Sequence, residues 1–146
     1  MIIRDTDCLS FLERKSGAEY FELNKNLFRF DAVEITTTIV TFDEQMRGWM
    51  AFVARAKDTA GLILAYERLD HFLKTFKSIP LLSFDEEAGK IFDKLRKQKI
   101  RVGTMDLRIA SIAISRNAIL VSRNLVDFER IPGLTFEDWT KKSYIN

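Results

Sequence analysis

Three acidic residues, Asp5, Glu44 and Asp106, are the best candidates for chemistry in this sequence. Asp5 directly follows a short apolar run, Glu44 comes soon after a second one, and Asp106 lies near an expected helix start. Carboxylates that meet in one crevice repel one another, and a hard divalent cation such as Mg²⁺ or Mn²⁺ relieves that repulsion. Such an ion can orient a water for attack on phosphorus. The three acids therefore predict metal-assisted phosphodiester hydrolysis, provided that the fold brings them together.

The elements that must position these acids are short β-strands separated by helices. Helical periodicity between apolar runs is typical of a parallel sheet with helices on both faces. In such a sheet, functional groups gather beyond the carboxyl ends of the strands, which is where the three acids are expected. Runs rich in Ile, Val and Leu predict strands at residues 1–4, 32–37 and 118–122, with 79–83 and 134–136 as further candidates.

Two amphipathic helices are predicted after the second strand. Apolar residues recur at three- and four-residue steps over 42–53 and again over 62–76, with a break at 58–61. We interpret both apolar stripes as core, and the alternative is a surface for a protein partner.

A third helix is predicted from a capping box at Ser83 and Glu86 to about Gln98. Its later part carries a basic run, which we interpret as a solvated face; the alternative is a track for a phosphate backbone. This run consists of Lys90, Lys94, Arg96, Lys97, Lys99 and Arg101.

Each candidate acid also has a purely structural interpretation near a helix start. Asp5 or Asp7 can cap the first helix, because an Asp side chain accepts backbone N–H groups there. Glu44 ends a capping-box pattern that begins at Thr41. Asp106 suits the first turn of a helix capped by the threonine two residues before it. Spacing alone leaves both interpretations open.

Composition narrows the classes of site and partner. The 146 residues, 47% hydrophobic and 30% charged, fit one domain over 1–146, and no linker or repeat divides them. Cys8 and His71 are the only residues of their kinds, which excludes an intramolecular disulfide and a Cys/His zinc site. We interpret Cys8 as a buried apolar residue and His71 as a surface residue.

Net charge and hydropathy do not identify a partner. The net charge of +2 neither requires nor excludes nucleic acid. The apolar run at the start is far shorter than a signal-peptide core or the roughly 20 residues of a membrane span. We therefore expect a cytoplasmic protein with no membrane partner.

Four segments, in order along the whole chain, resemble the motifs of the PIN family and particularly of its VapC-like toxins. Two positions depart from the family pattern: Arg4 stands where an apolar residue is usual, and Arg123 where Asn or Asp is commoner. The third segment, Gly-Thr-Met-Asp-Leu-Arg-Ile-Ala, is the most specific. The segments are Ile3-Arg4-Asp5-Thr6-Asp7, residues 39–48 with Glu44 four residues before Gly48, residues 103–110, and residues 120–134.

This resemblance implies an α/β, PIN-like three-layer fold with a central parallel sheet of about four or five strands flanked by helices. It implies a metal-dependent ribonuclease that uses Mg²⁺ or Mn²⁺ and hydrolyses RNA. Asp5 and Asp106 would ligate the metal, and Glu44 would complete or flank its shell. Either Asn124 or Asp127 would position water or a second ion, and the sequence does not choose between them. The expected substrate-binding residues are Thr6, Thr104, Arg108 and Arg123.

The resemblance also implies partners. A VapC-like toxin is expected to bind a small cognate antitoxin, which would bury an apolar groove on the early helices and place a basic residue near the acids. A homodimer is a further expectation. The alternative functions are an inactive PIN-like module that binds RNA or protein without cutting, and a phosphoacceptor receiver domain, whose expected lysine after a late strand is not evident.

Overall fold

A sheet of five parallel strands organises the computed structural model, which describes residues 1–142 apart from the side chain of Phe11. The strands lie in the order β3-β2-β1-β4-β5, so the central β1 is flanked by β2 and β4. Since all five run in the same direction, their carboxyl ends share one edge. The strands are β1 (Ile2–Arg4), β2 (Ile35–Thr38), β3 (Leu81–Leu82), β4 (Ile119–Val121) and β5 (Thr135–Glu137).

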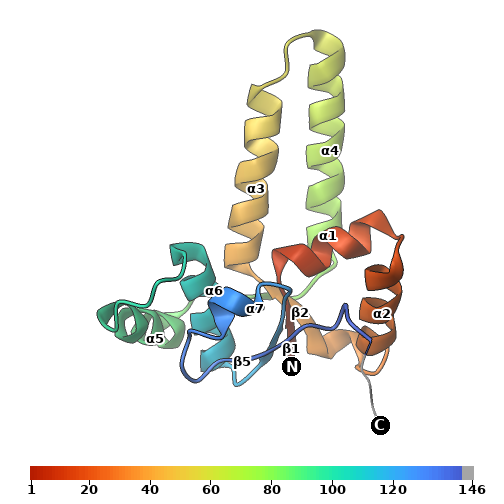
Figure 1. Cartoon of the computed structure of the whole chain (residues 1–146). Helices are drawn as coiled ribbons and strands as arrows, with labels where there is room; N and C mark the ends of the chain where they lie inside the picture. The colour runs from red at the N-terminus through yellow and green to blue at the C-terminus, as the bar shows by residue number, and fades with distance from the viewer. Residues whose placement is uncertain (143–146) are drawn as a thin grey trace.

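Helices cover both faces of this sheet, as Figure 1 shows. Successive residues of a strand point to opposite faces. Ile2 accordingly packs with the buried side chains of α1 and α2, whereas Ile3 packs with those of α5 and α6. The predicted three-layer α/β fold is confirmed. The helices are α1 (Thr6–Arg14), α2 (Ala18–Leu27), α3 (Ile39–Ala54), α4 (Thr59–Lys77), α5 (Glu86–Lys97), α6 (Thr104–Ser115) and α7 (Leu125–Phe128), with a 3-10 turn η1 (Ala32–Glu34).

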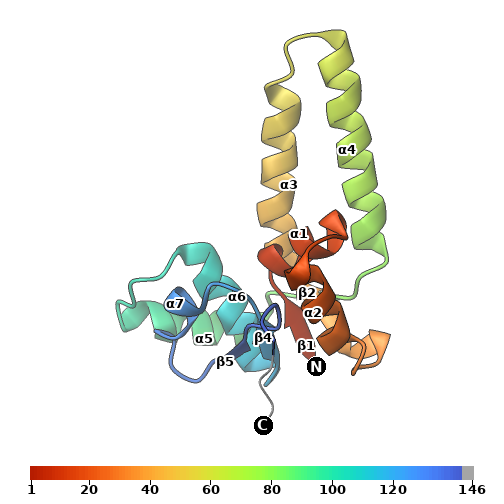
Figure 2. The ribbon, with the colours of Figure 1, turned by 45° about the vertical axis from the view of Figure 1, so that its right-hand side comes forward.

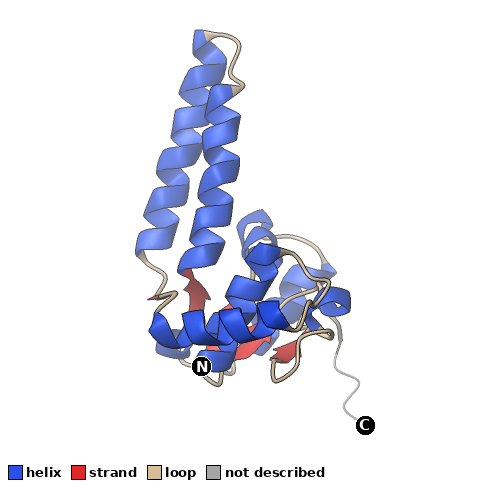
Figure 3. Cartoon of the chain, turned by 90° about the vertical axis from the view of Figure 1, so that its left-hand side faces the viewer, coloured by secondary structure: helices blue, strands red, loops and turns tan. Residues whose placement is uncertain are grey.

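The helices α3 and α4 lie side by side and project from the sheet as an antiparallel hairpin (Figures 1, 2 and 3). At its base, Phe42 and Trp49 of α3 pack against Phe72 of α4, and Leu9 of α1 joins the same cluster. The interpretation of the two apolar stripes as core is confirmed at the base of the hairpin and is wrong for its outer part. Large apolar side chains are exposed at Met50, Phe52, Leu62, Ile63, Leu64 and Tyr66.

No helix within residues 1–142 combines the length and apolar character needed to cross a bilayer.

The predicted strand at 32–37 begins too early. Residues 32–34 form η1, and the strand starts only at Ile35. The Glu34 carboxylate accepts a hydrogen bond from the Asp31 backbone N–H at 3.1 Å, which favours a tight turn over extended backbone.

Two predicted capping boxes are also wrong. α3 begins at Ile39, because the Thr38 hydroxyl accepts the Thr41 N–H at 3.0 Å, so Thr41 lies inside the helix and cannot cap it. α5 is capped by Asp85, whose carboxylate accepts the Ala88 N–H at 3.1 Å, and not by Ser83 two residues earlier. In both cases a neighbouring side chain of equal capping ability takes the position.

Arg4 is an unusual residue for the end of the central strand. Its Nε is buried and has no hydrogen-bond partner among the described residues, and burial lowers the pKa of its guanidinium. Leaving a buried donor unsatisfied costs about 1–3 kcal/mol. Arg4→Met, which keeps an unbranched side chain, is therefore expected to raise the free energy of unfolding by about 1 kcal/mol in urea titrations.

Arg4→Ala serves as the control for this prediction, because it removes the packing of the side chain and should lower the same free energy. If Arg4→Met is less stable than the wild type, the unsatisfied Nε is not a source of instability.

Candidate active site

Asp5 lies at the centre of the carboxyl edge of the sheet, directly after β1. It is only 5% exposed, and both of its carboxylate oxygens are held. The Thr6 N–H donates to Oδ1 at 2.7 Å, and the Ser122 hydroxyl donates to Oδ2 at 2.8 Å. Burial raises the pKa of Asp5, these two hydrogen bonds oppose the rise, and the charges of Asp7 and Glu44 add to it. The Asp5 carboxylate thus has a fixed orientation and acidic neighbours.

Asp106 lies in the first turn of α6 and belongs to the same acidic group. Its pKa is raised to about 6, first by burial and then by the negative charges of Asp5, Glu44, Asp127 and Asp7. The expected Thr104 cap is wrong, because α6 is preceded by Gly103 without a side-chain cap. Carboxylates from four separate parts of the chain are therefore close enough to repel one another.

Asn124 links two of these acids. Its side-chain Nδ2 donates to Asp106 Oδ2 at 3.4 Å and to Asp127 Oδ2 at 3.1 Å. Its backbone N–H donates to the Ser122 hydroxyl at 3.1 Å, and that hydroxyl in turn holds Asp5. The sequence left open whether Asn124 or Asp127 completes the site. In the structure these two side chains are hydrogen-bonded to each other.

Glu44 approaches the group from α3, where its side chain is exposed. The Thr6 hydroxyl donates to Glu44 Oε2 at 3.3 Å, while the Thr6 N–H binds Asp5. Thr6 therefore connects two predicted metal ligands, one after β1 and one on α3.

Two residues that sequence reasoning did not place in the site belong to this arrangement. Ser122 bonds to Asp5 and Asn124, and the charge of Asp7 reaches both Asp5 and Asp106. A polar residue directly after a buried strand is the signal that could have found Ser122. Asp7 lies in the family-like first motif and was considered only as a cap.

The predicted substrate-binding residues are not all beside the acids. Thr104 is exposed in the first turn of α6, two residues before Asp106. Arg108 follows Asp106 by two residues, about 200° around the helix, and so projects from its opposite side. There its Nη1 lies 3.3 Å from Met105 Sδ, and its guanidinium lies 5.9 Å from the Phe92 ring centroid. The structure does not bring Arg108 to the carboxylates.

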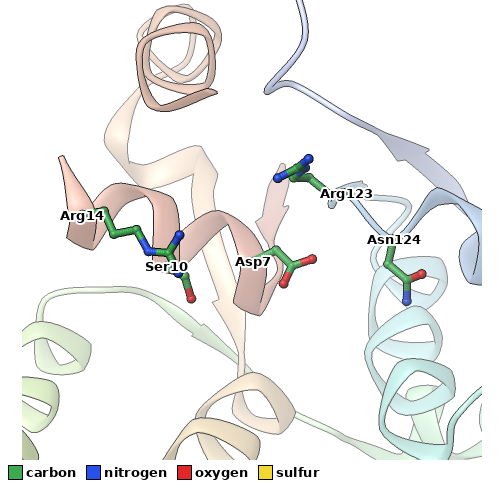
Figure 4. Close-up of a pocket in the computed structure, with 5 residues that line it drawn as sticks. All are labelled: Asp7, Ser10, Arg14, Arg123 and Asn124. Atoms are coloured by element: carbon green, nitrogen blue, oxygen red, sulfur yellow. The ribbon is translucent and has the colours of Figure 1, made fainter. Parts of the chain in front are cut away.

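Arg123 does lie beside the acidic group. It is exposed after β4 and lines an open pocket of about 580 Å³ that Figure 4 shows from close by. We call this the α1 pocket. Its lining residues are Asp7, Ser10, Arg14, Arg123 and Asn124.

The interpretations of the single cysteine and histidine are confirmed. Cys8 is fully buried, its thiol donates to the Val121 carbonyl at 3.1 Å, and burial raises its pKa to about 12, so it stays protonated and unreactive. His71 is exposed on α4.

The donors at the sheet edge suit a hard cation without forming a closed cage. Within residues 1–142, no three Asp, Glu, His or Cys side chains are arranged to hold a metal ion as they lie. Mg²⁺ does not need such a cage, because it keeps several waters and takes one or two carboxylates. The available donors are oxygens. Burial and then repulsion between the acids raise the pKa of Asp106, and a cation would relieve the repulsion. The residues therefore fit Mg²⁺ or Mn²⁺.

No family model matches this sequence. A 53-residue segment is 45% identical to Ribonuclease VapC1 of Haemophilus influenzae strain R2866, covering 36% of this chain and 40% of that protein. A 65-residue segment is 40% identical to the tRNA(fMet)-specific endonuclease VapC of Salmonella typhimurium, covering 42% and 49%. The chain thus spans less than half the length of these relatives.

The similarity in structure is more extensive. In the crystal structure of VapBC2 from Rickettsia felis bound to a DNA fragment from their promoter, one chain superposes on this one with a TM-score of 0.69. The two chains are 26% identical, and the superposition covers 95% of this chain and 99% of that one.

Proposed function

We propose that this chain, a VapC-like protein with the PIN-domain fold, is a metal-dependent endoribonuclease that hydrolyses RNA phosphodiester bonds. The observation that carries the proposal is the group of carboxylates at the sheet edge, whose mutual repulsion contributes to the raised pKa of Asp106. Such a group is unfavourable by itself and becomes favourable around a divalent cation. The named ribonuclease relatives support the same activity.

Asp5 and Asp106 are the residues that would hold Mg²⁺ or Mn²⁺. When bound, the ion would lower the pKa of a water and offset the charge that develops on the phosphate. Asp5 needs no reorientation, because Thr6 and Ser122 already fix its two oxygens. Asn124 positions Asp106 by a hydrogen bond from its amide.

Glu44 would complete the site from α3. Its Oε2 accepts from the Thr6 hydroxyl, so Oε1 is the atom that would accept a hydrogen bond from the attacking water. Asp127, held by Asn124, would orient a second water or ion.

We further propose that the chain is the toxin of a type II toxin–antitoxin pair. The outer part of the α3–α4 hairpin carries large exposed apolar side chains, which suit the apolar face of a small antitoxin. The similar VapBC2 structure supports this partner. A homodimer and a cytoplasmic location stay predictions.

An inactive module that binds RNA or protein without cutting is the second candidate. The observation in its favour is that, among the described residues, three ligands do not converge on one point. This candidate predicts RNA binding without turnover.

The testing experiment follows cleavage of a mixed RNA pool and of initiator tRNA on gels, in Mg²⁺, in Mn²⁺ and in a chelator. The tRNA is included because a relative is named for it. We expect cleavage in either metal, none in the chelator, and recovery when Mg²⁺ is added in excess. Equal cleavage in the chelator would contradict the metal dependence, and RNA binding without any cleavage would favour the inactive module.

A further inference from the structure

We propose that the α1 pocket binds a backbone phosphate of the RNA that flanks the one being cut, with Arg14 and Arg123 as its ligands. This inference rests on the proposed ribonuclease function. It also predicts the path of the bound strand, which would run from the acids along α1.

The geometry of α1 shapes one wall of the pocket. Asp7, Ser10 and Arg14 are three and seven residues apart, so they fall on one face of the helix. Seven residues rise by about 10 Å. Figure 4 shows Asp7 at the start of α1 and Arg14 farther along it, with Arg123 and Asn124 coming from the segment after β4. The pocket therefore extends from the acids toward the end of α1.

The pocket is continuous with the candidate active site through two of its lining residues. Asn124 donates hydrogen bonds to Asp106 and Asp127, and Asp7 follows Asp5 by two residues at the start of α1. An RNA strand whose scissile phosphate lies at Asp5 and Asp106 would thus have its neighbouring phosphate at the mouth of the pocket.

Charge explains why a flanking phosphate needs this pocket. The acids repel the RNA backbone on either side of the metal, and the positive charges of Arg14 and Arg123, which both line the pocket, would offset that repulsion. Arginine binds phosphate through two parallel N–H bonds. The cation at Arg123 replaces the Asn or Asp expected from the family-like pattern, so this chain carries more positive charge here than the pattern predicts.

The arginines need not be free to bind a phosphate. Both already interact with other groups of the protein. A guanidinium carries five N–H donors, so it can bind a group of the protein and phosphate oxygens at the same time. The Ser10 hydroxyl would not donate to the phosphate, because it already donates to the Thr6 carbonyl at 3.1 Å.

The basic run on α5 is the competing path for the strand. Its first member, Lys90, is engaged by Glu86 and Glu87, at 3.3 and 3.1 Å. Lys97 is exposed at the end of α5 and provides a matched control, since Lys97→Gln removes one positive charge from that path.

The experiment measures binding of a labelled single-stranded RNA to the non-cutting Asp106→Asn protein in constant Mg²⁺ over a range of KCl. The logarithm of the affinity falls with the logarithm of salt, with a slope of about 0.7 per phosphate contact for single strands. Arg14→Gln and Arg123→Gln are each expected to weaken binding by roughly three- to tenfold and to reduce the slope by about 0.7. Arg14→Lys should keep the slope, and Lys97→Gln should change nothing.

The outcomes separate the two proposals. An unchanged slope in both arginine variants, with RNA binding intact, would overturn the phosphate site but not the nuclease. If only Lys97→Gln reduces the slope, the RNA strand follows α5, and this result would also overturn the phosphate site. If the wild-type protein neither cuts nor binds RNA, the proposed function fails and the phosphate site fails with it. Circular dichroism of each variant confirms that the fold is kept.

Discussion

Asp106→Asn is expected to lose RNA cleavage by about a thousandfold or more while the protein keeps its fold. The amide has nearly the shape of the carboxylate, and its oxygen can still accept the hydrogen bond from Asn124 Nδ2. It carries no charge, so it is a much weaker ligand for Mg²⁺. Gel assays of cleavage, together with circular dichroism, measure both parts of the prediction.

The same variant should be more stable than the wild type at pH 7 in the absence of divalent cations. The pKa of Asp106 is about 6 in the folded protein, well above the ordinary value of an aspartic acid, so its ionised form is disfavoured by folding. Because the group is half-exposed and screened by solvent, we expect a gain of about 1 kcal/mol, well below what the full shift would give. Urea titration measures it.

Asp43→Asn is the matched control for both effects. Asp43 is a neighbour of Glu44 on α3, but its carboxylate pairs with Arg47 at 2.8 Å instead of joining the acidic group. Its loss should change cleavage and stability little, because an exposed ion pair contributes about 0–1 kcal/mol. Wild-type cleavage in Asp106→Asn, or an equal loss in Asp43→Asn, would contradict the proposed site.

The main features of the fold and the acidic group could be predicted from the sequence because each depends on a local pattern. Apolar runs locate β1, β2 and β4, and the strand-end rule together with the family-like motifs selects Asp5, Glu44 and Asp106 from 21 acidic residues. Parallel strand directions account for Asp5 and Glu44, whereas Asp106 follows α5 and not a strand, so its position beside them depends on how α6 packs on the sheet.

The incorrect or missing details depend on distinctions that the sequence does not make. Thr38 and Thr41 compete to cap α3, and Asp85 and Ser83 compete for α5. These residue types differ little in capping energy, so tertiary packing decides between them. Arg108 was grouped with Asp106 by its motif, although two residues along a helix place side chains on opposite sides.

The α1 pocket shows a different limit. Asp7, Ser10 and Arg14 have helical spacing, but nothing in that spacing says that the segment after β4 lies across from them. Likewise, no local pattern indicates that Ser122 would hold Asp5, which is 117 residues away. Contacts between distant segments come from the strand order β2-β1-β4, which the sequence did not supply.

The second large effect concerns pH. In the protein with its metal, the apparent affinity for Mg²⁺ should fall by about tenfold for each pH unit below 6, because Asp106 must lose its proton before it can bind the ion. The Mg²⁺ concentration that gives half-maximal cleavage, measured between pH 5 and 7.5, tests this. A midpoint that does not change with pH would contradict a role for Asp106 as a ligand.

Lower pH weakens Mg²⁺ binding by Asp106, but in the absence of divalent cations it should make this carboxylate less destabilising to the fold. Its pKa is higher in the folded than in the unfolded chain, so folding favours the protonated form, and this group's contribution improves as pH falls from about 7 to 4. Other acids behave conversely: hydrogen bonds from the Ala88 N–H and Arg116 lower the pKa of Asp85, and its contribution is lost on acidification. The stability of the wild type minus that of Asp106→Asn isolates the first effect. That difference should shrink toward zero as pH falls from 7 to 4, and saturating Mg²⁺ at pH 7 should reverse its sign, because only the wild type binds the ion tightly.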